Sequence, residues 1–225
     1  MVEKMNKLII ASETIIVENE DILIEEITKD VNLYLKGKVN CGIKKINKKG
    51  TINVYLEKES DSLIEFFLKL ENNQNKIYFH NEENTKLNVH FSATFSGENH
   101  LEIKNELKHS NIKNDLKIRL VEKEGTINVL AVGDIKEKTK EINYLEDIKA
   151  LTTNNERIKI MPDLLVKSKE VIANHNTTIS DISKKELFYL KSKGLSEAKA
   201  TEMIKKGFLK GILKNKELGG EENES

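Results

Sequence analysis

The sequence predicts a mainly β fold that ends in a small helical hairpin, and two observations carry this prediction. Apolar and polar residues alternate along many short segments between Leu8 and Ser180. Alternation with a period of two is typical of strands that have one buried and one exposed face. After Ser183 the apolar residues recur at the three- and four-residue spacing of a helix. Strands and helices are therefore expected in separate parts of the chain.

The predicted strands are short and are joined by segments rich in Asn, Gly, Lys and Glu. In the first clear one, 51–57, Ile52, Val54 and Leu56 alternate with polar neighbours. Similar segments follow at 87–95, 101–103, 116–120 and 127–131. Sandwiches, barrels and β-solenoids share this pattern. The Asn-Gly and Asp-Gly dipeptides of tight hairpins do not occur between these segments. Their absence favours a solenoid, because a coil that keeps turning one way needs no such turns.

The helical hairpin has recognisable signals at its ends. Ser183 and Glu186 have the spacing of a capping box, in which the serine hydroxyl accepts from the backbone of the first turn. Gly194 stands where a C′ glycine ends a helix, and Ser196 can cap a second one. We therefore divide the chain into a β domain over 1–180, a helical domain over 181–216 and a disordered acidic tail over 217–225.

Composition excludes several classes of partner. The 225 residues contain 37 Lys and Arg against 37 Asp and Glu, so no net field attracts nucleic acid or an anionic membrane. No segment reaches the roughly 18–20 apolar residues of a membrane span, and the first ten residues lack the pattern of a signal peptide. A single cysteine, Cys41, excludes an internal disulfide framework. We expect a cytoplasmic protein.

Longer motifs occur between Ala150 and Leu209. They include VIANHNTT at 171–178, ISKKELFYL at 182–190, KGLSEA at 193–198 and IKKGFL at 204–209, preceded by a proline at Pro162. In these segments the chain resembles the SufB/SufD family of iron–sulfur cluster assembly proteins, particularly through Leu-Phe-Tyr and Gly-Phe. Upstream of Ala150 only compatible strand patterning is found. The chain is also shorter than typical members, and looks like a short scaffold of the minimal archaeal type.

The resemblance implies a right-handed parallel β-helix followed by a helical domain that docks onto the ABC ATPase SufC. The ends of the β-helix would pair two scaffold chains, so we expect a homodimer with two ATPase subunits. We expect no catalysis by the chain itself, and its sequence has no phosphate-binding loop of the Walker type. The expected ATPase contacts are Phe188, Tyr189, Leu195, Met203 and Phe208, although the same side chains could simply pack the two helices together.

The metal ligands that we predict are His175, Asp147 and Cys41, although Cys41 could instead be a small buried apolar residue and Asp147 an ordinary carboxylate of a surface turn. His175 matches a histidine of the family, and a neutral imidazole is a good iron ligand. Asp147 takes the place of the scaffold cysteine, while Asn174 and Asn176 replace two glutamates that flank the histidine in SufB. Clusters are normally held by thiolates, so a single cysteine per chain suggests at most a cluster bound transiently at a dimer interface.

Two alternatives stay open from the sequence. The scarcity of thiols favours a SufD-like structural subunit that binds no cluster. A carbohydrate-active β-helix protein would show the same strand pattern, but needs a carboxylate-lined groove. Four further histidines are interpreted as scattered surface residues: His80, His90, His100 and His109.

Overall fold

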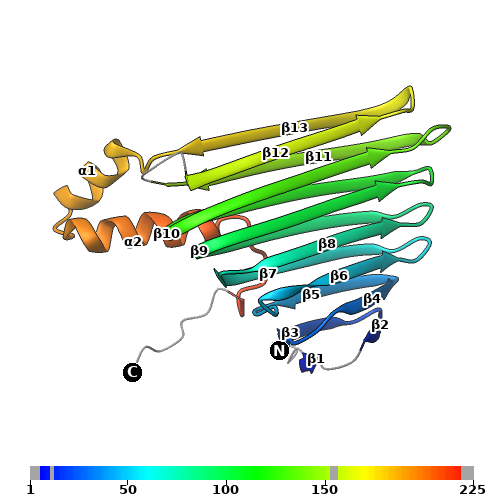
Figure 1. Ribbon diagram of the computed structural model, residues 1–225, viewed down its shortest axis with the longest axis horizontal. Helices are drawn as coiled ribbons and strands as arrows, with labels where there is room; N and C mark the ends of the chain where they lie inside the picture. The colour runs from blue at the N-terminus through cyan, green and yellow to red at the C-terminus, as the bar shows by residue number, and fades with distance from the viewer. Residues whose placement is uncertain (1–5, 11–12, 153–156, 219–225) are drawn as a thin grey trace.

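A computed structural model describes residues 6–10, 13–152 and 157–218 and shows a parallel β-solenoid followed by two helices (Figure 1). All the strand pairs in the described ranges are parallel. Parallel neighbours cannot be joined by tight hairpins. The predicted solenoid with a C-terminal helical pair is therefore confirmed, and the hairpin-based sandwiches and barrels are excluded.

Each coil contributes one strand to each of two stacks. The first stack contains, in spatial order, β1 (Asn6–Ile10), β3 (Asp21–Ile27), β5 (Lys38–Ile43), β7 (Asp61–Glu71), the first halves of β9 (Lys86–Leu107) and β10 (Ile112–Ile135), β11 (Lys140–Leu151) and β13 (Glu170–Ser180). The second stack contains β2 (Thr14–Glu18), β4 (Val31–Lys36), β6 (Lys49–Leu56), β8 (Gln74–Asn81), the second halves of β9 and β10, and β12 (Ile158–Val166). The strands lengthen from five residues in β1 and β2 to 12 in β11.

The core lies between the two stacks. The inward residues of the alternating segments meet there, and the five apolar ones predicted in 87–95 are all buried: Leu87, Val89, Phe91, Ala93 and Phe95. Each inward side chain lies above its counterpart in the preceding coil, because the register repeats from coil to coil. Phe66 and Phe91, for example, have ring centroids 5.3 Å apart.

Left-handed backbone turns the corners of the coils. Asn72 (φ 56°), Gly97 (φ 67°) and Gly125 (φ 142°) lie at successive corners on the same side. The side-chain oxygen of Asn72 accepts from the N–H of Glu98 at 3.0 Å. Asn19, Asn84 and Asn111 adopt similar conformations at other corners. Asparagine is suited to these positions because its short polar side chain tolerates left-handed backbone.

The two helices are α1 (Lys184–Ser192) and α2 (Glu197–Lys210). The Ser183 hydroxyl accepts from the N–H of Glu186 at 3.3 Å, and the Ser196 hydroxyl caps α2 in the same way. Gly194, at φ 90°, follows the end of α1. The predicted caps are thus confirmed. In the part of the chain that the structure describes, no helix is both long and apolar enough to cross a membrane.

The chain continues beyond α2 along the outside of the first stack. Leu218 is buried there, although the sequence analysis placed it in a disordered tail starting at 217. Its burial shows that an apolar residue within a polar sequence can still be an anchor. The remainder of the predicted tail, 219–225, lies outside the described residues.

Two glycine substitutions test the role of the corners. A Cβ at Gly125 would lie 2.1 Å from the carbonyl oxygen of Gly97, whereas a Cβ at Gly207 in α2 would meet no atom within 4 Å. Gly125→Ala should therefore lower the free energy of unfolding by at least about 2 kcal/mol. Gly207→Ala should raise it by about 0.5–1 kcal/mol. Urea denaturation of both variants measures the difference, and equal stabilities would contradict this account of the corners.

Candidate functional site

An inward-facing row of the first stack leads to the C-terminal end of the solenoid. Its successive positions are Cys41, Ile64, Val89, Leu116, Glu146 and His175. β13 pairs with β11 on one side only, so among the described strands none covers its other edge. His175 is consequently exposed although it takes an inward position. The row therefore ends in an imidazole at the open end of the solenoid.

Glu146 lies directly below His175 and is only 5% exposed. The hydroxyl of Tyr144 donates to its Oε2 at 2.8 Å. Burial raises the pKa of Glu146, and the opposing effects of Tyr144 and His175 are smaller. Gly133 leaves room for the tyrosine, because a Cβ there would lie 2.6 Å from the ring. Tyr144, Glu146 and His175 thus form a polar group beneath the open end.

The sequence analysis missed Glu146, although its signal is present. The alternation of β11 places Ile142, Tyr144, Ile148 and Ala150 inward, and Glu146 takes the same phase. A carboxylate in the apolar phase of a strand must be buried, and a buried carboxylate needs a partner. This phase distinguishes Glu146 from its neighbour Asp147.

Asp147 points outward, on the opposite face of the strand from Glu146 and His175. It forms an ion pair with Arg119 and accepts from Nδ2 of Asn176 at 2.7 Å. Burial raises the pKa of Asp147, but Asn176 and Arg119 outweigh this effect and hold the pKa below its ordinary value. Its carboxylate is engaged within the chain. The structure does not bring Asp147 and His175 to the same side of β11 and β13.

Cys41 shares the inward row with His175, but five strand steps separate them. At about 4.8 Å a step, the separation is roughly 24 Å. The thiol is buried, and burial raises its pKa to about 12, so it carries no thiolate near neutral pH. Among the described residues, no three side chains of His, Cys, Asp or Glu come close enough to hold a metal. The three predicted ligands are not brought together within one chain.

The helical residues predicted to contact a partner fall into two groups. Phe188, Tyr189 and Met203 are 75%, 59% and 57% exposed, while Leu195 is half-buried. Phe208 instead packs with Leu209 against Phe67, Val121 and Leu151 of the solenoid. Its ring centroid is 5.9 Å from the guanidinium carbon of Arg119. Phe208 therefore anchors the helical pair, whereas the first three are available to a partner.

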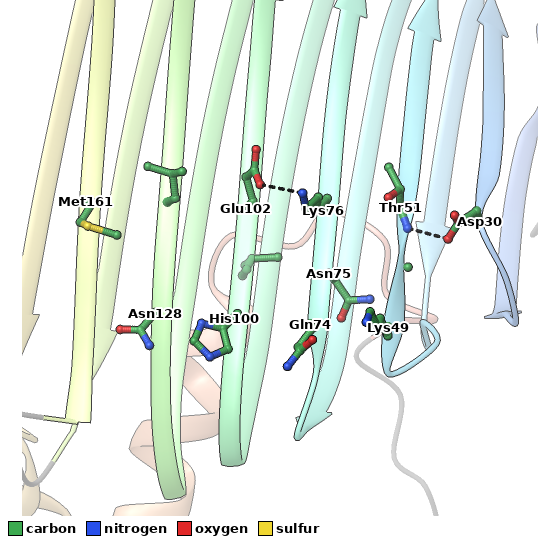
Figure 2. Close-up of a pocket in the computed structure, with 13 residues that line it drawn as sticks. Asp30, Lys49, Thr51, Gln74, Asn75, Lys76, His100, Glu102, Asn128 and Met161 are labelled. Carbon is green, nitrogen blue, oxygen red and sulfur yellow. Dashed lines mark hydrogen bonds and ion pairs between the residues drawn. The ribbon is translucent and has the colours of Figure 1, made fainter.

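A depression of about 740 Å³ lies on the outer face of the second stack (Figure 2). His100 lies between Gln74 and Asn128 in its lowest row. The carboxylates that line it are engaged: Glu102 with Lys76, and Asp30 with the N–H of Thr51. It is lined by no Phe, Tyr or Trp, the side chains on which sugar rings usually stack. These residues give no support to the carbohydrate-active alternative.

The other histidines differ in their environments. His100 and His109 are exposed, as the sequence analysis expected. His80 is stacked on Tyr55 with ring centroids 4.6 Å apart. The surface interpretation is wrong for His90, which is buried beneath the residues that follow α2 and contacts Glu65 at 2.9 Å. Burial of an outward strand residue by a distant segment cannot be read from local alternation.

Comparisons with known proteins identify relatives of this chain. The model of the family described as "SUF system FeS cluster assembly, SufBD core domain" matches residues 62–208. An iron–sulfur cluster assembly SufBD family protein of Pyrococcus horikoshii is 42% identical over 65 residues, which cover 29% of this chain and 15% of the relative. One from Mycobacterium bovis is 38% identical over 53 residues, or 24% of this chain and 6% of the relative. The aligned stretches thus span a small part of the relatives' length.

The ion pair of Asp147 yields a prediction with a defined pH dependence. Asp147→Asn should lower the free energy of unfolding by about 0.5–1 kcal/mol near pH 7, since the pair is partly exposed. The native pKa is lower than the ordinary 3.8, so the stabilisation is fully present above that pH. It is lost as the pH falls through the native pKa. Urea denaturation between pH 2 and 7 measures the difference in the free energy of unfolding between the wild type and Asp147→Asn. Asp163→Asn, on the exposed face of β12, is the control. A pH-independent difference would refute the ion-pair role.

Proposed function

The chain belongs to the SufBD family of iron–sulfur cluster assembly proteins, and from this membership we propose that it is a cytoplasmic scaffold without catalysis of its own. In this proposal it acts with a SufC-like ABC ATPase, and two scaffold chains associate with two ATPase subunits. The observation that carries the proposal is the family match over 62–208, which includes the solenoid from β7 onward and nearly all of the helical pair.

The exposed side of the helical pair is the proposed ATPase contact. α1 contains no buried residue, and Phe188, Tyr189 and Met203 present large apolar surfaces to solvent. Soluble proteins expose contiguous apolar patches mainly where a partner binds. Aromatic residues of this kind commonly supply most of the binding energy at interfaces.

The open end of the solenoid is the proposed contact between two scaffold chains. Ile172 on β13 is 61% exposed, and Met161, Leu165 and Val166 on β12 are also exposed. An uncovered parallel edge with apolar side chains invites pairing with another chain. A symmetric contact there would bring His175 and Glu146 of both chains to one interface. Two imidazoles with carboxylates behind them would then face any metal bound between the chains.

A structural subunit that binds no cluster remains a second candidate, and two observations favour it. Cys41 is buried and protonated, and Asp147 is held in an ion pair. The ligands left at the open end are imidazole and carboxylate, whereas clusters are normally held by thiolates. The two functions differ in whether iron binds near His175.

Substitutions on the helical pair test the ATPase contact. Phe188→Ala with Tyr189→Ala should reduce co-purification of the ATPase at least about tenfold, because aromatic hot spots often contribute 2 kcal/mol or more. The solenoid should remain folded, as judged by circular dichroism. Ile16→Ala, an exposed apolar change at the other end of the solenoid, serves as control. Undiminished co-purification of the double variant would refute the contact.

Anaerobic reconstitution with iron and sulfide tests the proposed cluster site. The wild-type chain should show visible iron–sulfur absorbance that His175→Ala abolishes. Glu146→Gln should weaken iron binding by about 10- to 100-fold, the usual effect of losing a carboxylate behind a histidine ligand. His109→Ala, which changes an exposed histidine distant from His175 in the sequence, is the control. If the wild-type chain takes up no iron, the structural subunit is the correct function; if His175→Ala binds normally, the site lies elsewhere.

A further inference from the structure

The residues that follow α2 return along the outer wall of the solenoid. This C-terminal segment, 211–218, follows the last turn of α2, where the carbonyl of Leu209 accepts from the Ser92 hydroxyl of β9 at 2.8 Å. It ends at Leu218, which is buried against the wall at β5. Gly42 on β5 makes the space, because a Cβ there would lie 3.2 Å from the Leu218 side chain and 3.1 Å from that of Asn215. Figure 1 shows the red segment running from α2 toward β7 and β5.

Glu65 of β7 binds the middle of this segment. Its Oε1 accepts from the backbone N–H of Lys214 at 2.6 Å, and its Oε2 from that of Asn215 at 2.7 Å. His90 of β9 contacts the same carboxylate at 2.9 Å. Burial tends to raise the pKa of Glu65, but His90 and the two N–H groups bring it below its ordinary value. A buried carboxylate with all these partners is a strong attachment point.

The attachment of the C-terminal segment to Glu65 links parts of the chain that are distant along the solenoid axis. α1 leaves the solenoid after β13, the last strand of the first stack. The C-terminal segment attaches at β9, β7 and β5, which are separated from β13 by β10 and β11. The helical pair is therefore held at both ends, by different coils.

We propose that the C-terminal segment acts as a latch. By binding to the carboxylate of Glu65, it fixes the helical pair on the outer face of the solenoid and couples the position of the helical pair to the β5–β9 coils. The latch uses backbone N–H groups of the segment, so it depends on the carboxylate of Glu65 rather than on the side chains of Lys214 and Asn215. This device goes beyond the proposed function, because it operates in the isolated chain without any ATPase.

Hydrogen exchange of the full-length chain tests the latch first. Glu65→Gln removes the negative charge and replaces one of the two acceptor oxygens by an NH₂ donor, so in the observed arrangement one of the two backbone N–H groups would face a donor. Exchange in 211–218 should become about tenfold faster or more, since charge-assisted bonds are lost. Glu71→Gln makes the same change at an exposed residue of β7, and in this variant exchange in 211–218 should match that of the wild type. Strands β7–β10 should stay protected in both variants. Unchanged exchange in 211–218 would overturn the proposal.

A second variant keeps the proposal testable if Glu65→Gln loosens the whole fold. Leu218→Ala removes the far anchor and leaves the Glu65–His90 contact intact. Spin labels at Glu202→Cys on α2 and His109→Cys on the solenoid, in a Cys41→Ala background, measure the distance between the two parts. The distribution should be narrow in the parent and clearly broader with Leu218→Ala. A distribution that stays narrow while 211–218 exchanges faster would show a passive attachment and would refute the latch.

Discussion

The register between coils governs nearly everything else in this structure. Because every coil lies parallel above the last, each side chain has its counterpart one strand step away along the axis. Apolar rows become continuous core, as in the row that connects Ile64, Val89 and Leu116. A polar residue in such a row must find its partner in the same or an adjacent coil. Glu146 does so with Tyr144 and, at the end of the row, faces His175.

The same constraint separates the two proposed functional regions of the molecule. At the end of the stack no described strand covers β13, so its inward row opens and exposes His175. On the outer face of the first stack, outward side chains contact the helical pair and the segment that follows it. Phe67 packs with Phe208, and Glu65 accepts from the backbone of the C-terminal segment. The proposed metal site lies at the open end of the solenoid, whereas the proposed ATPase contact lies on the helical pair that packs against its outer face.

The features that depend on local sequence could be predicted. Period-two alternation gave the strands, the caps at Ser183 and Ser196 gave the helices, and asparagine-rich connections suited the left-handed corners. The features that depend on register between coils could not. The family resemblance points to Asp147, which lies on the outward face of β11, whereas Glu146 in the buried phase of the same strand lies next to His175.

Burial by remote segments was equally inaccessible to sequence reasoning. His90 has an outward position and looks like a surface residue until 211–218 covers it. The distance between Cys41 and His175 likewise follows only from counting the coils that separate them.

Native mass spectrometry after anaerobic co-expression with an ABC ATPase tests the central claim most directly. The account predicts one assembly that contains two copies of this chain and two of the ATPase. A chain that stays monomeric, with no ATPase bound, would contradict it.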